Sequence, residues 1–360
     1  MIKCVGCGGP LQNVDANKPF YTPKPLNHEH PVMCQRCFRM THYGEVIPSQ
    51  MNNQAFLEII ESLAGSKSLI VMVVDLFDLE ASILPQLKRL SQSDDILVMA
   101  NKRDILPKSV NNARLKHRVM KRLHAHGLTP LDIVIVSAKK RHGIDACLDA
   151  IAAHTKGRDV VFVGASNVGK STLINRFLDA TLDDSGQRIT VSSTPATTQG
   201  LIPIPFESGV LYDTPGIIVS NHPLSLLNAS DYKPLEPTRE IKPKTYQLSS
   251  DQTVFISGLL RLDIVKGDPA NITIYAGESV TVHRRKQTDA QAFYRKHLGT
   301  LLTPPIGVFD FSLTAYNMRF AAGEELVVPG VAFITFKAPT STRVFTPKPL
   351  MPYVREALIG

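Results

Sequence analysis

Residues 164–171, GASNVGKS, carry the glycines, lysine and hydroxyl of a phosphate-binding loop at the required spacing. Gly164 and Gly169 let the backbone curl so that its N–H groups point at phosphate oxygens. Lys170 reaches the β- and γ-phosphates of a nucleotide, and the Ser171 hydroxyl is a ligand for Mg²⁺. The other predicted nucleotide-binding residues of this loop are Ser166, Asn167, Val168 and Thr172.

A second motif, Asp-Thr-Pro-Gly at 213–216, follows a predicted strand. Asp213 at the end of that strand would hold Mg²⁺, and Gly216 would let its N–H approach the γ-phosphate. By itself this motif is common in turns. It indicates a nucleotide site because it follows the phosphate loop in the chain. In the polar loop between them we predict Thr198 as a further Mg²⁺ ligand, with Thr197 as the alternative.

Two short motifs have the chemistry to recognise guanine. In Asn101-Lys-Arg-Asp104 the aspartate would accept hydrogen bonds from the ring N1–H and the exocyclic amine of guanine. Adenine presents no such donor pair and would leave this carboxylate unpaired. The stem of Lys102 would lie along the base, and Asn101 would tie the loop together. The second motif consists of Ser137, Ala138 and Lys139, which offer a backbone N–H to guanine O6 and a stem for the other face of the base.

Five cysteines occupy positions 4, 7, 34, 37 and 147. Two C-x2-C pairs, Cys4 with Cys7 and Cys34 with Cys37, favour tetrahedral Zn²⁺ ligation over disulfides or redox chemistry. His28 and His30 lie between the pairs; we expect them to face solvent, with metal ligation as the alternative. Cys147 falls in a helical pattern and is expected in the core.

The elements that position these motifs alternate between buried strands and helices. Predicted strands are Leu69–Val74, Ile96–Ala100, Ile133–Val136 and Val160–Val163. Helices are predicted near Met51–Leu63 and at Ala113–His126, Ile144–His154 and Leu173–Leu178. All-apolar strands separated by helices predict a parallel sheet covered on both faces, whose carboxyl-end loops bind ligands.

Beyond residue 216 the pattern changes. Residues 221–250 are predicted as an irregular connection. The following segments predict a mainly β or α+β domain: strands at Gln252–Ile256, Leu260–Val265, Asn271–Tyr275, Ser279–His283 and Leu326–Phe336, with a helix at Asp289–Leu298.

The composition is that of an ordinary globular protein, with 360 residues, 43% of them hydrophobic and a net charge of +8. This length predicts two or three domains. The composition and the motifs predict a zinc module at 1–48, a nucleotide-binding domain at 49–225 and a further domain at 226–360. No apolar run reaches the ~20 residues of a membrane span, and the N-terminus resembles no signal or transit peptide, so the cytoplasm is the expected compartment. The mild basic excess favours a polyanionic partner such as RNA, with no sequence-specific DNA binding expected.

Together the nucleotide motifs resemble the five signature elements of Ras-like GTPases, but in a changed order. The two guanine motifs, at 101–104 and 137–139, precede the phosphate loop, the Thr switch and Asp213–Gly216. This order indicates a circularly permuted P-loop GTPase domain, since domain termini are often close together at the surface. In this order the γ-phosphate-sensing loop leads directly to the C-terminal domain, which loss of that phosphate would reorient.

With the paired cysteines and Val73-Val-Asp-Leu-Phe-Asp78 added, nearly the whole chain resembles the YqeH-type circularly permuted GTPases. The resemblance implies a GTP-hydrolysing factor in assembly of the small (30S) ribosomal subunit. It further implies an N-terminal zinc module and a C-terminal domain that binds RNA or protein.

Hydrolysis is expected to be slow because Ile217 and Ile218 stand where Ras-like enzymes commonly have a glutamine that orients water. Similar GTPases with asparagine at the position of Asn167 bind K⁺ there. The alternative for Asn167 is a loop-capping role. Two further readings stay open: an RNA-binding sensor of GTP and GDP that scarcely hydrolyses, and a tRNA-modification-type GTPase.

Two basic stretches could bind RNA phosphates or simply be solvated. The first, on a predicted helix with little acid nearby, consists of Arg114, Lys116, Arg118, Lys121 and Arg122. The second is Arg284-Arg-Lys286. Few aromatic residues lie among them, so base stacking is not indicated.

Overall fold

The computed structural model describes residues 2, 4, 11–16, 20–26, 32–35, 38, 50–51, 68–92, 95–180, 202–206, 209–214, 216–217, 219–266, 269–307 and 311–359. The chain forms two compact units. The first unit is Met1–Arg103 with Val119–Ile218, and the second is Asp104–Arg118 with Val219–Gly360. The domain boundaries after residues 48 and 225 stay predictions.

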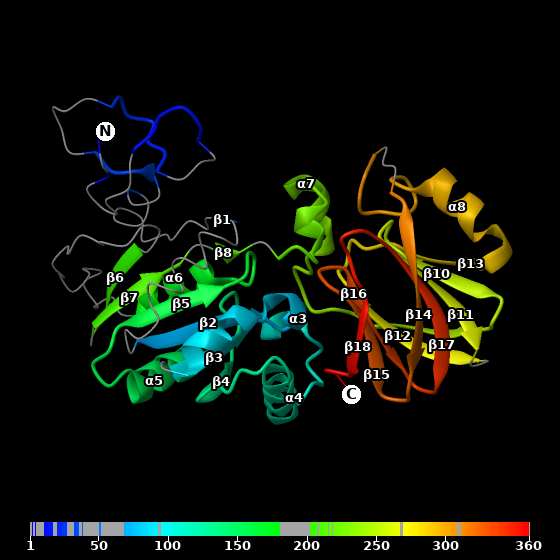
Figure 1. Cartoon of the computed structure of the whole chain (residues 1–360), viewed down its shortest axis with the longest axis horizontal. Coiled ribbons are helices and arrows are strands. Elements are labelled where there is room, and N and C mark those ends of the chain that lie inside the picture. Colours follow the sequence, from blue (N-terminus) through cyan, green and yellow to red (C-terminus); the bar gives the residue numbers. More distant parts are fainter. Residues whose placement is uncertain are drawn as a thin grey trace. The chain divides into compact units, whose positions relative to one another are not determined.

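A six-stranded sheet organises the first unit, with its strands in the order β4-β3-β2-β5-β7-β6 (Figure 1). The strands are β2 (Leu69–Asp75), β3 (Asp95–Asn101), β4 (Asp132–Ile135), β5 (Val160–Gly164), β6 (Ile202–Phe206) and β7 (Gly209–Asp213). All are parallel except β6, which runs antiparallel to β7. The parallel sheet predicted from sequence is confirmed, because these strands are apolar on both faces.

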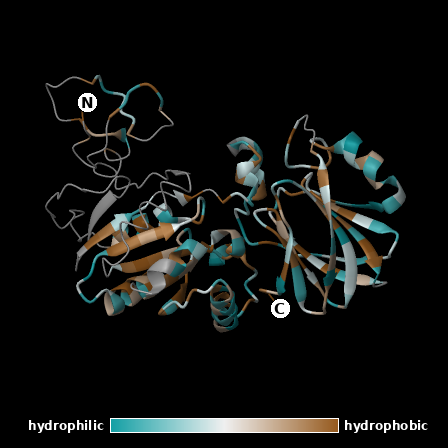
Figure 2. Ribbon diagram, viewed as in Figure 1, coloured by the Kyte–Doolittle hydropathy of each residue, from teal (hydrophilic) through white to brown (hydrophobic). Residues whose placement is uncertain are grey.

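Burial explains why the parallel strands lack polar–apolar alternation. Every residue of β2 and of β5 is buried, and both strands are coloured as hydrophobic in Figure 2. The helices of this region are α3 (Leu79–Ser82), α4 (Asn112–Ala125), α5 (Ile144–Thr155) and α6 (Lys170–Ala180). Phe177 of α6 meets Phe162 of β5 edge to face, with ring centroids 5.8 Å apart.

Strand β5, which leads into the phosphate loop, lies between β2 and β7. Chain segments from before and after the phosphate loop therefore flank it in the sheet. A short parallel pair, β1 (Gln50–Met51) with β8 (Gly216–Ile217), joins the N-terminal region to the Asp213–Gly216 motif. This arrangement is a P-loop GTPase-like sheet with a permuted chain order.

The second unit contains two five-stranded sheets that are antiparallel throughout. One has the order β13 (Val282–Lys286), β10 (Gln252–Ile256), β11 (Leu260–Lys266), β17 (Thr340–Pro347), β14 (Leu313–Phe320). The other has the order β18 (Tyr353–Glu356), β15 (Glu324–Val328), β16 (Ala332–Phe336), β12 (Ala270–Ala276), β9 (Lys244–Leu248). Apolar residues from both sheets form one core, in which Phe320 and Phe336 stack with centroids 4.1 Å apart. Helices α7 (Ala229–Tyr232) and α8 (Ala290–His297) also belong to this unit, as does the first half of α4.

Short 3₁₀ helices fill several connections: Pro85–Gln92, Arg103–Ile105, Pro223–Ser225, Lys233–Leu235 and Gln287–Asp289. Three sequence predictions for this half of the chain were wrong. The strand predicted at Ser279–His283 begins only at Val282, and Leu326–Phe336 divides into β15 and β16 around a turn. The irregular connection predicted over 221–250 contains α7 and β9.

The helix expected near 51–63 lies almost wholly outside the described residues. Among the helices that the structure describes, none has both the length and the apolar character to cross a bilayer.

Candidate nucleotide-binding site

The phosphate loop joins β5 to α6, and its backbone has the left-handed turns that such a loop needs. Asn167 has φ of 66° and Gly169 has φ of 85°. Gly164 is equally restricted by packing, since a Cβ there would lie 3.0 Å from the carbonyl oxygen of Val73. Helix α6 begins at Lys170, so its N-terminal N–H groups face the loop, as phosphate binding requires.

Asn101 at the end of β3 connects the loops that sequence analysis assigned to one ligand. Its Nδ2 donates to the carbonyl oxygen of Val168 at 2.9 Å, and its Oδ1 accepts from the N–H of Ala138 at 3.0 Å. Asn101 is buried, so both bonds are shielded from water. One side chain thus holds together a guanine motif, the phosphate loop and the Ser-Ala-Lys motif.

The Lys170 ammonium meets the Asp213 carboxylate and the carbonyl oxygen of Thr214. Both charged side chains are buried, with 6% of Lys170 and 0% of Asp213 exposed. The Thr214 hydroxyl donates to the carbonyl oxygen of Phe162 at 2.8 Å, which fixes the loop against β5. The predicted phosphate and Mg²⁺ residues are therefore together, although 43 positions separate them.

The Asp213–Gly216 motif also pairs with the phosphate loop through the backbone. The N–H of Ser166 donates to the carbonyl oxygen of Ile217 at 2.7 Å. A Cβ on Gly216 would lie 3.2 Å from the Cα of Ser166, so a side chain there would force the loops apart. The Ser166 hydroxyl is buried and has no hydrogen-bond partner among the described residues. A buried hydroxyl without a partner is costly, which fits a loop built to meet a polar ligand.

Asp75 is a site residue to which the sequence analysis gave no role. It ends β2, and its Oδ2 lies 2.7 Å from the ammonium of Lys102. Its other oxygen accepts from the N–H of Phe77 at 2.9 Å, so the carboxylate is held in place. Lys102 itself has φ of 64°. The signal was an aspartate at the carboxyl end of a buried parallel strand, where ligand sites form.

The Ser-Ala-Lys motif forms a tight turn after β4. Ser137 and His142 exchange backbone hydrogen bonds of 2.9 and 3.1 Å, and the Ser137 hydroxyl accepts from the N–H of Lys140 at 3.1 Å. Lys139 is exposed, whereas Ala138 is buried and its carbonyl oxygen accepts from Arg176 of α6 at 3.1 Å. Asp104 follows β3 in a single 3₁₀ turn, and its role in base recognition stays a prediction.

At the N-terminus the structure brings together one cysteine from each predicted zinc pair. The N–H of Cys34 donates to the sulfur of Cys4 at 3.1 Å, and both residues are buried. Backbone N–H groups that donate to sulfur orient and stabilise metal-binding thiolates, so this pair fits a zinc module. Cys7, Cys37, Thr197 and Thr198 lie outside the described residues, and no cluster of metal ligands occurs within the described ones.

The basic stretch on α4 is partly neutralised, contrary to the sequence analysis. Arg122 donates from Nη2 to Glu80 of α3 at 3.0 Å, and His126 lies 3.1 Å from the same oxygen. The prediction that little acid lies nearby was therefore wrong, and Arg122 is a structural residue. Glu80 was not singled out because it is remote in sequence.

Comparison with known proteins identifies the family. The chain is 37% identical over 367 residues to "Uncharacterized protein YqeH" of Bacillus subtilis, covering 99% of both chains. The chain belongs to the YqeH family. A YqeH-like C-terminal family model matches residues 269–358, and the family model described as "50S ribosome-binding GTPase" matches residues 159–247.

More distant YqeH relatives extend to plants. "NO-associated protein 1, chloroplastic/mitochondrial" of Arabidopsis thaliana is 30% identical over 348 residues, which cover 84% of this chain and 62% of the plant protein. The crystal structure of YjeQ from Thermotoga maritima shares 24% identity over 42% of this chain and 48% of its own. Its TM-score of 0.26 is too low to establish a common arrangement. Membership of the YqeH family of GTPases implies that the chain uses GTP, GDP and Mg²⁺.

Proposed function

We propose that this protein is a GTP-dependent switch of the cytoplasm that acts in assembly of the small (30S) ribosomal subunit. The observation that carries the proposal is the pair of hydrogen bonds that the Asn101 side chain makes, one donated to Val168 and one accepted from Ala138. They tie a guanine motif to the phosphate loop, which is the arrangement that a guanine nucleotide needs. The permuted motif order and the YqeH family membership support the same function.

Each part of the nucleotide has a proposed partner. The Asp104 carboxylate accepts from the guanine edge, and the stems of Lys102 and Lys139 cover the faces of the base. Loop N–H groups and Lys170 hold the phosphates, while Ser171, Thr198 and Asp213 ligate Mg²⁺. Bound Mg²⁺ neutralises charge on the β- and γ-phosphates.

Slow intrinsic hydrolysis follows from Ile217. Its side chain is 3% exposed and has no group that could orient water. We propose that K⁺ near Asn167 and the ribosomal partner raise the rate. The buried isoleucine also favours a second candidate function, an RNA-binding sensor that distinguishes GTP from GDP with little hydrolysis.

Residues 219–360 belong to the second unit and follow Gly216 and Ile217 almost directly in the chain. The loop that senses the γ-phosphate is thus the covalent lead into the C-terminal region, so its movement on hydrolysis would be transmitted to that region. We propose that residues 1–48 bind Zn²⁺ and help to dock the protein on the ribosome.

Nucleotide-dependent co-sedimentation tests this function. The full chain, loaded with GTP, a non-hydrolysable GTP analogue or GDP, is sedimented with isolated 30S and 50S subunits, and GTP turnover is measured with each. Binding to 30S that requires the triphosphate, with faster turnover, is expected. Lys170→Ala is the control that should lose both. Nucleotide-independent binding, or binding to 50S alone as the family description "50S ribosome-binding GTPase" suggests, would contradict the proposal.

A further inference from the structure

The sheet β13-β10-β11-β17-β14 of the second unit has two faces of opposite character. Alternate residues of the central strands point into the core. Among them are Val254 of β10, Leu262 of β11 and Val344 of β17, which lie opposite one another on the three neighbouring strands. The other face carries polar and charged residues. We call it the outer face, defined by Arg261, Asp263, Lys266, Asn317, Arg319, Ser341, Arg343 and Phe345.

Helix α8 packs on β10, toward one edge of this sheet. Its Tyr294 stacks on Phe255 of β10 with centroids 6.2 Å apart, and the Tyr294 hydroxyl donates to the carbonyl oxygen of Gly258 at 3.0 Å. Farther across the sheet, Arg319 of β14 and Arg343 of β17 are exposed. The part of the outer face on β17 and β14 is therefore open within this unit.

A β-bulge places a lysine on this face. Ile264 pairs with Thr342, but Lys266 pairs with Ser341, so Val265 is the extra residue. Without the bulge, strand alternation would direct Lys266 to the same face as the buried Ile264. The bulge also leaves Val265 52% exposed, which no packing need explains. Ser341 in turn pairs with Arg319, so Lys266, Ser341 and Arg319 form one row across three strands.

The next rows add an arginine and an aromatic ring. Arg343 lies between its strand partners Asp263 and Asn317, and its Nε donates to the Asn317 side-chain oxygen at 3.3 Å. In the row beyond, Arg261 lies over the ring of Phe345, 4.5 Å from its centroid. Arg261 is also bound through both nitrogens to Asp263, at 2.8 and 2.7 Å, so that pair is neutral.

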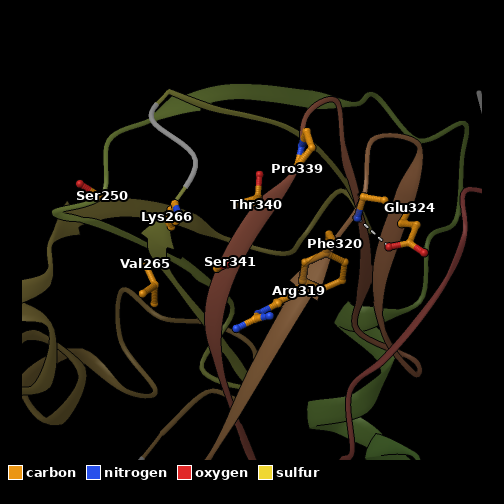
Figure 3. Close-up of a pocket in the computed structure, with 10 residues that line it drawn as sticks. Ser250, Val265, Lys266, Arg319, Phe320, Glu324, Pro339, Thr340 and Ser341 are labelled. Carbon is orange, nitrogen blue, oxygen red and sulfur yellow. Dashed lines mark hydrogen bonds between the residues drawn. The ribbon is translucent and has the colours of Figure 1, made fainter.

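The three remaining cations of the outer face are Lys266, Arg319 and Arg343. Among the described residues, no carboxylate forms an ion pair with Lys266, Arg319 or Arg343. A cavity of about 980 Å³ opens beside the first row, and Lys266, Arg319, Ser341 and Thr340 contribute to its lining (Figure 3). Glu324 also lines it, but its carboxylate accepts the N–H of Ala321 at 2.7 Å.

We infer that the outer face binds the sugar–phosphate backbone of single-stranded RNA, through Lys266, Arg319 and Arg343. Neighbouring strands lie about 4.8 Å apart, so the cations on β11 and β14 are separated by about 10 Å across the sheet. Several separated positive charges match a chain of phosphates better than one small anion. Arginine guanidinium groups bind phosphate through two parallel hydrogen bonds. The inference deepens the ribosomal role proposed above and depends on it for the source of the RNA.

The test is a charge-reversed variant of the full chain, R319E/R343E, with R319A/R343A as a milder form. Binding of a short fluorescent single-stranded RNA of mixed sequence is measured by anisotropy over a series of salt concentrations. Reversal should weaken binding about tenfold or more, and loss of two phosphate contacts should reduce the salt slope by about 1.4. The control K242E/K348E makes the same charge change at exposed lysines outside the outer face and should leave the slope unchanged.

Both sets of variants are also checked for GTP affinity and thermal unfolding, which should match the parent protein. Normal GTP binding with weakened RNA binding supports the inference even if co-sedimentation with ribosomal subunits fails. An unchanged RNA slope in R319E/R343E overturns it. Lost binding to ribosomal subunits with RNA binding intact also overturns it, since an acidic protein would then be the partner.

Discussion

The side chain of Asn101 donates a hydrogen bond to the carbonyl oxygen of Val168, a residue 67 positions later in the chain. In the permuted order Asn101 precedes the phosphate loop. This contact therefore joins the guanine motif to the phosphate loop even though their order along the chain is reversed. The same amide accepts from Ala138. Because each bond is buried, loss of the amide would leave backbone groups unpaired, at a cost of about 1–3 kcal/mol each.

Gly169→Ala should disrupt this contact. The new Cβ would collide with the Asn101 amide nitrogen, and φ of 85° is unfavourable for alanine. We expect GTP affinity, measured by calorimetry, to fall about 100-fold or more, since the phosphate loop and the guanine motif would separate. Gly157→Ala is the matched control, because Gly157 has φ of 77° and nothing within 4 Å of its added Cβ. Equal affinities of the two variants would show that the Asn101 contact does not support the site.

Local patterns were sufficient to predict the nucleotide-binding half of the fold. The strand Leu69–Asp75 is wholly apolar up to its last residue, and buried strands of this kind belong to parallel sheets. The positions of the nucleotide-binding loops follow from the same strands, because ligands bind at the carboxyl ends of parallel strands. What the sequence could not show was a partner far along the chain, such as Asp75 for Lys102 or Glu80 for Arg122. Such pairs depend on which strands and helices become neighbours, and no local period encodes that.

The second unit was harder to predict for a different reason. Sequence analysis predicted no strand at β14, although its residues alternate between half-buried and exposed over most of its length and end in the buried Phe320. Its pairing with β17 supplies the hydrogen bonds that make it a strand. The bulge at Val265 shifts the alternation by one residue, which a two-residue period cannot anticipate.

Asp104→Asn should change which nucleotide is bound. The carboxylate is proposed to accept two hydrogen bonds, from the N1–H and the exocyclic amine of guanine. In the asparagine variant the side-chain NH2, itself a donor, would face one of these two donors. We expect GTP affinity to fall about 100-fold or more, with a gain for xanthosine triphosphate, because unpaired polar groups in a binding site are strongly rejected. Competition calorimetry with the two nucleotides and ATP measures this. A parent protein that binds ATP as tightly as GTP would contradict guanine recognition by Asp104.

K⁺ should accelerate hydrolysis relative to Na⁺ at matched ionic strength. Asn167 is exposed at φ of 66° in the phosphate loop, so its side-chain oxygen is available to a cation beside the phosphates. We expect at least about a tenfold higher turnover in K⁺, equivalent to about 1.4 kcal/mol of transition-state stabilisation. The variant Asn167→Ala should lose the difference in turnover between the two salts. Equal rates of the parent protein in the two salts would leave Asn167 as a loop-capping residue.

Cys4→Ser and Cys34→Ser should each release zinc. The two residues are in contact through the N–H of Cys34 and the sulfur of Cys4, so one cysteine of each predicted C-x2-C pair lies beside one of the other. We expect about one Zn²⁺ per parent chain by atomic absorption and a large loss in either variant, since a closed site needs all four ligands. Nucleotide affinity should persist, because the zinc site is proposed to act in docking.

Cys147→Ala is the control for zinc content, because Cys147 is fully buried in α5 and burial raises the pKa of its thiol to about 12. A thiol that stays protonated neither binds metal nor reacts with alkylating reagents. Its raised pKa contributes stability below the ordinary value of 9.0, and this contribution is lost as the pH rises toward 12. Native protein should therefore resist alkylation at Cys147 near neutral pH, as mass spectrometry can check. Zinc loss in Cys147→Ala, with full retention in Cys4→Ser, would refute the Cys4 assignment, since the metal would then depend on a thiol outside the two pairs.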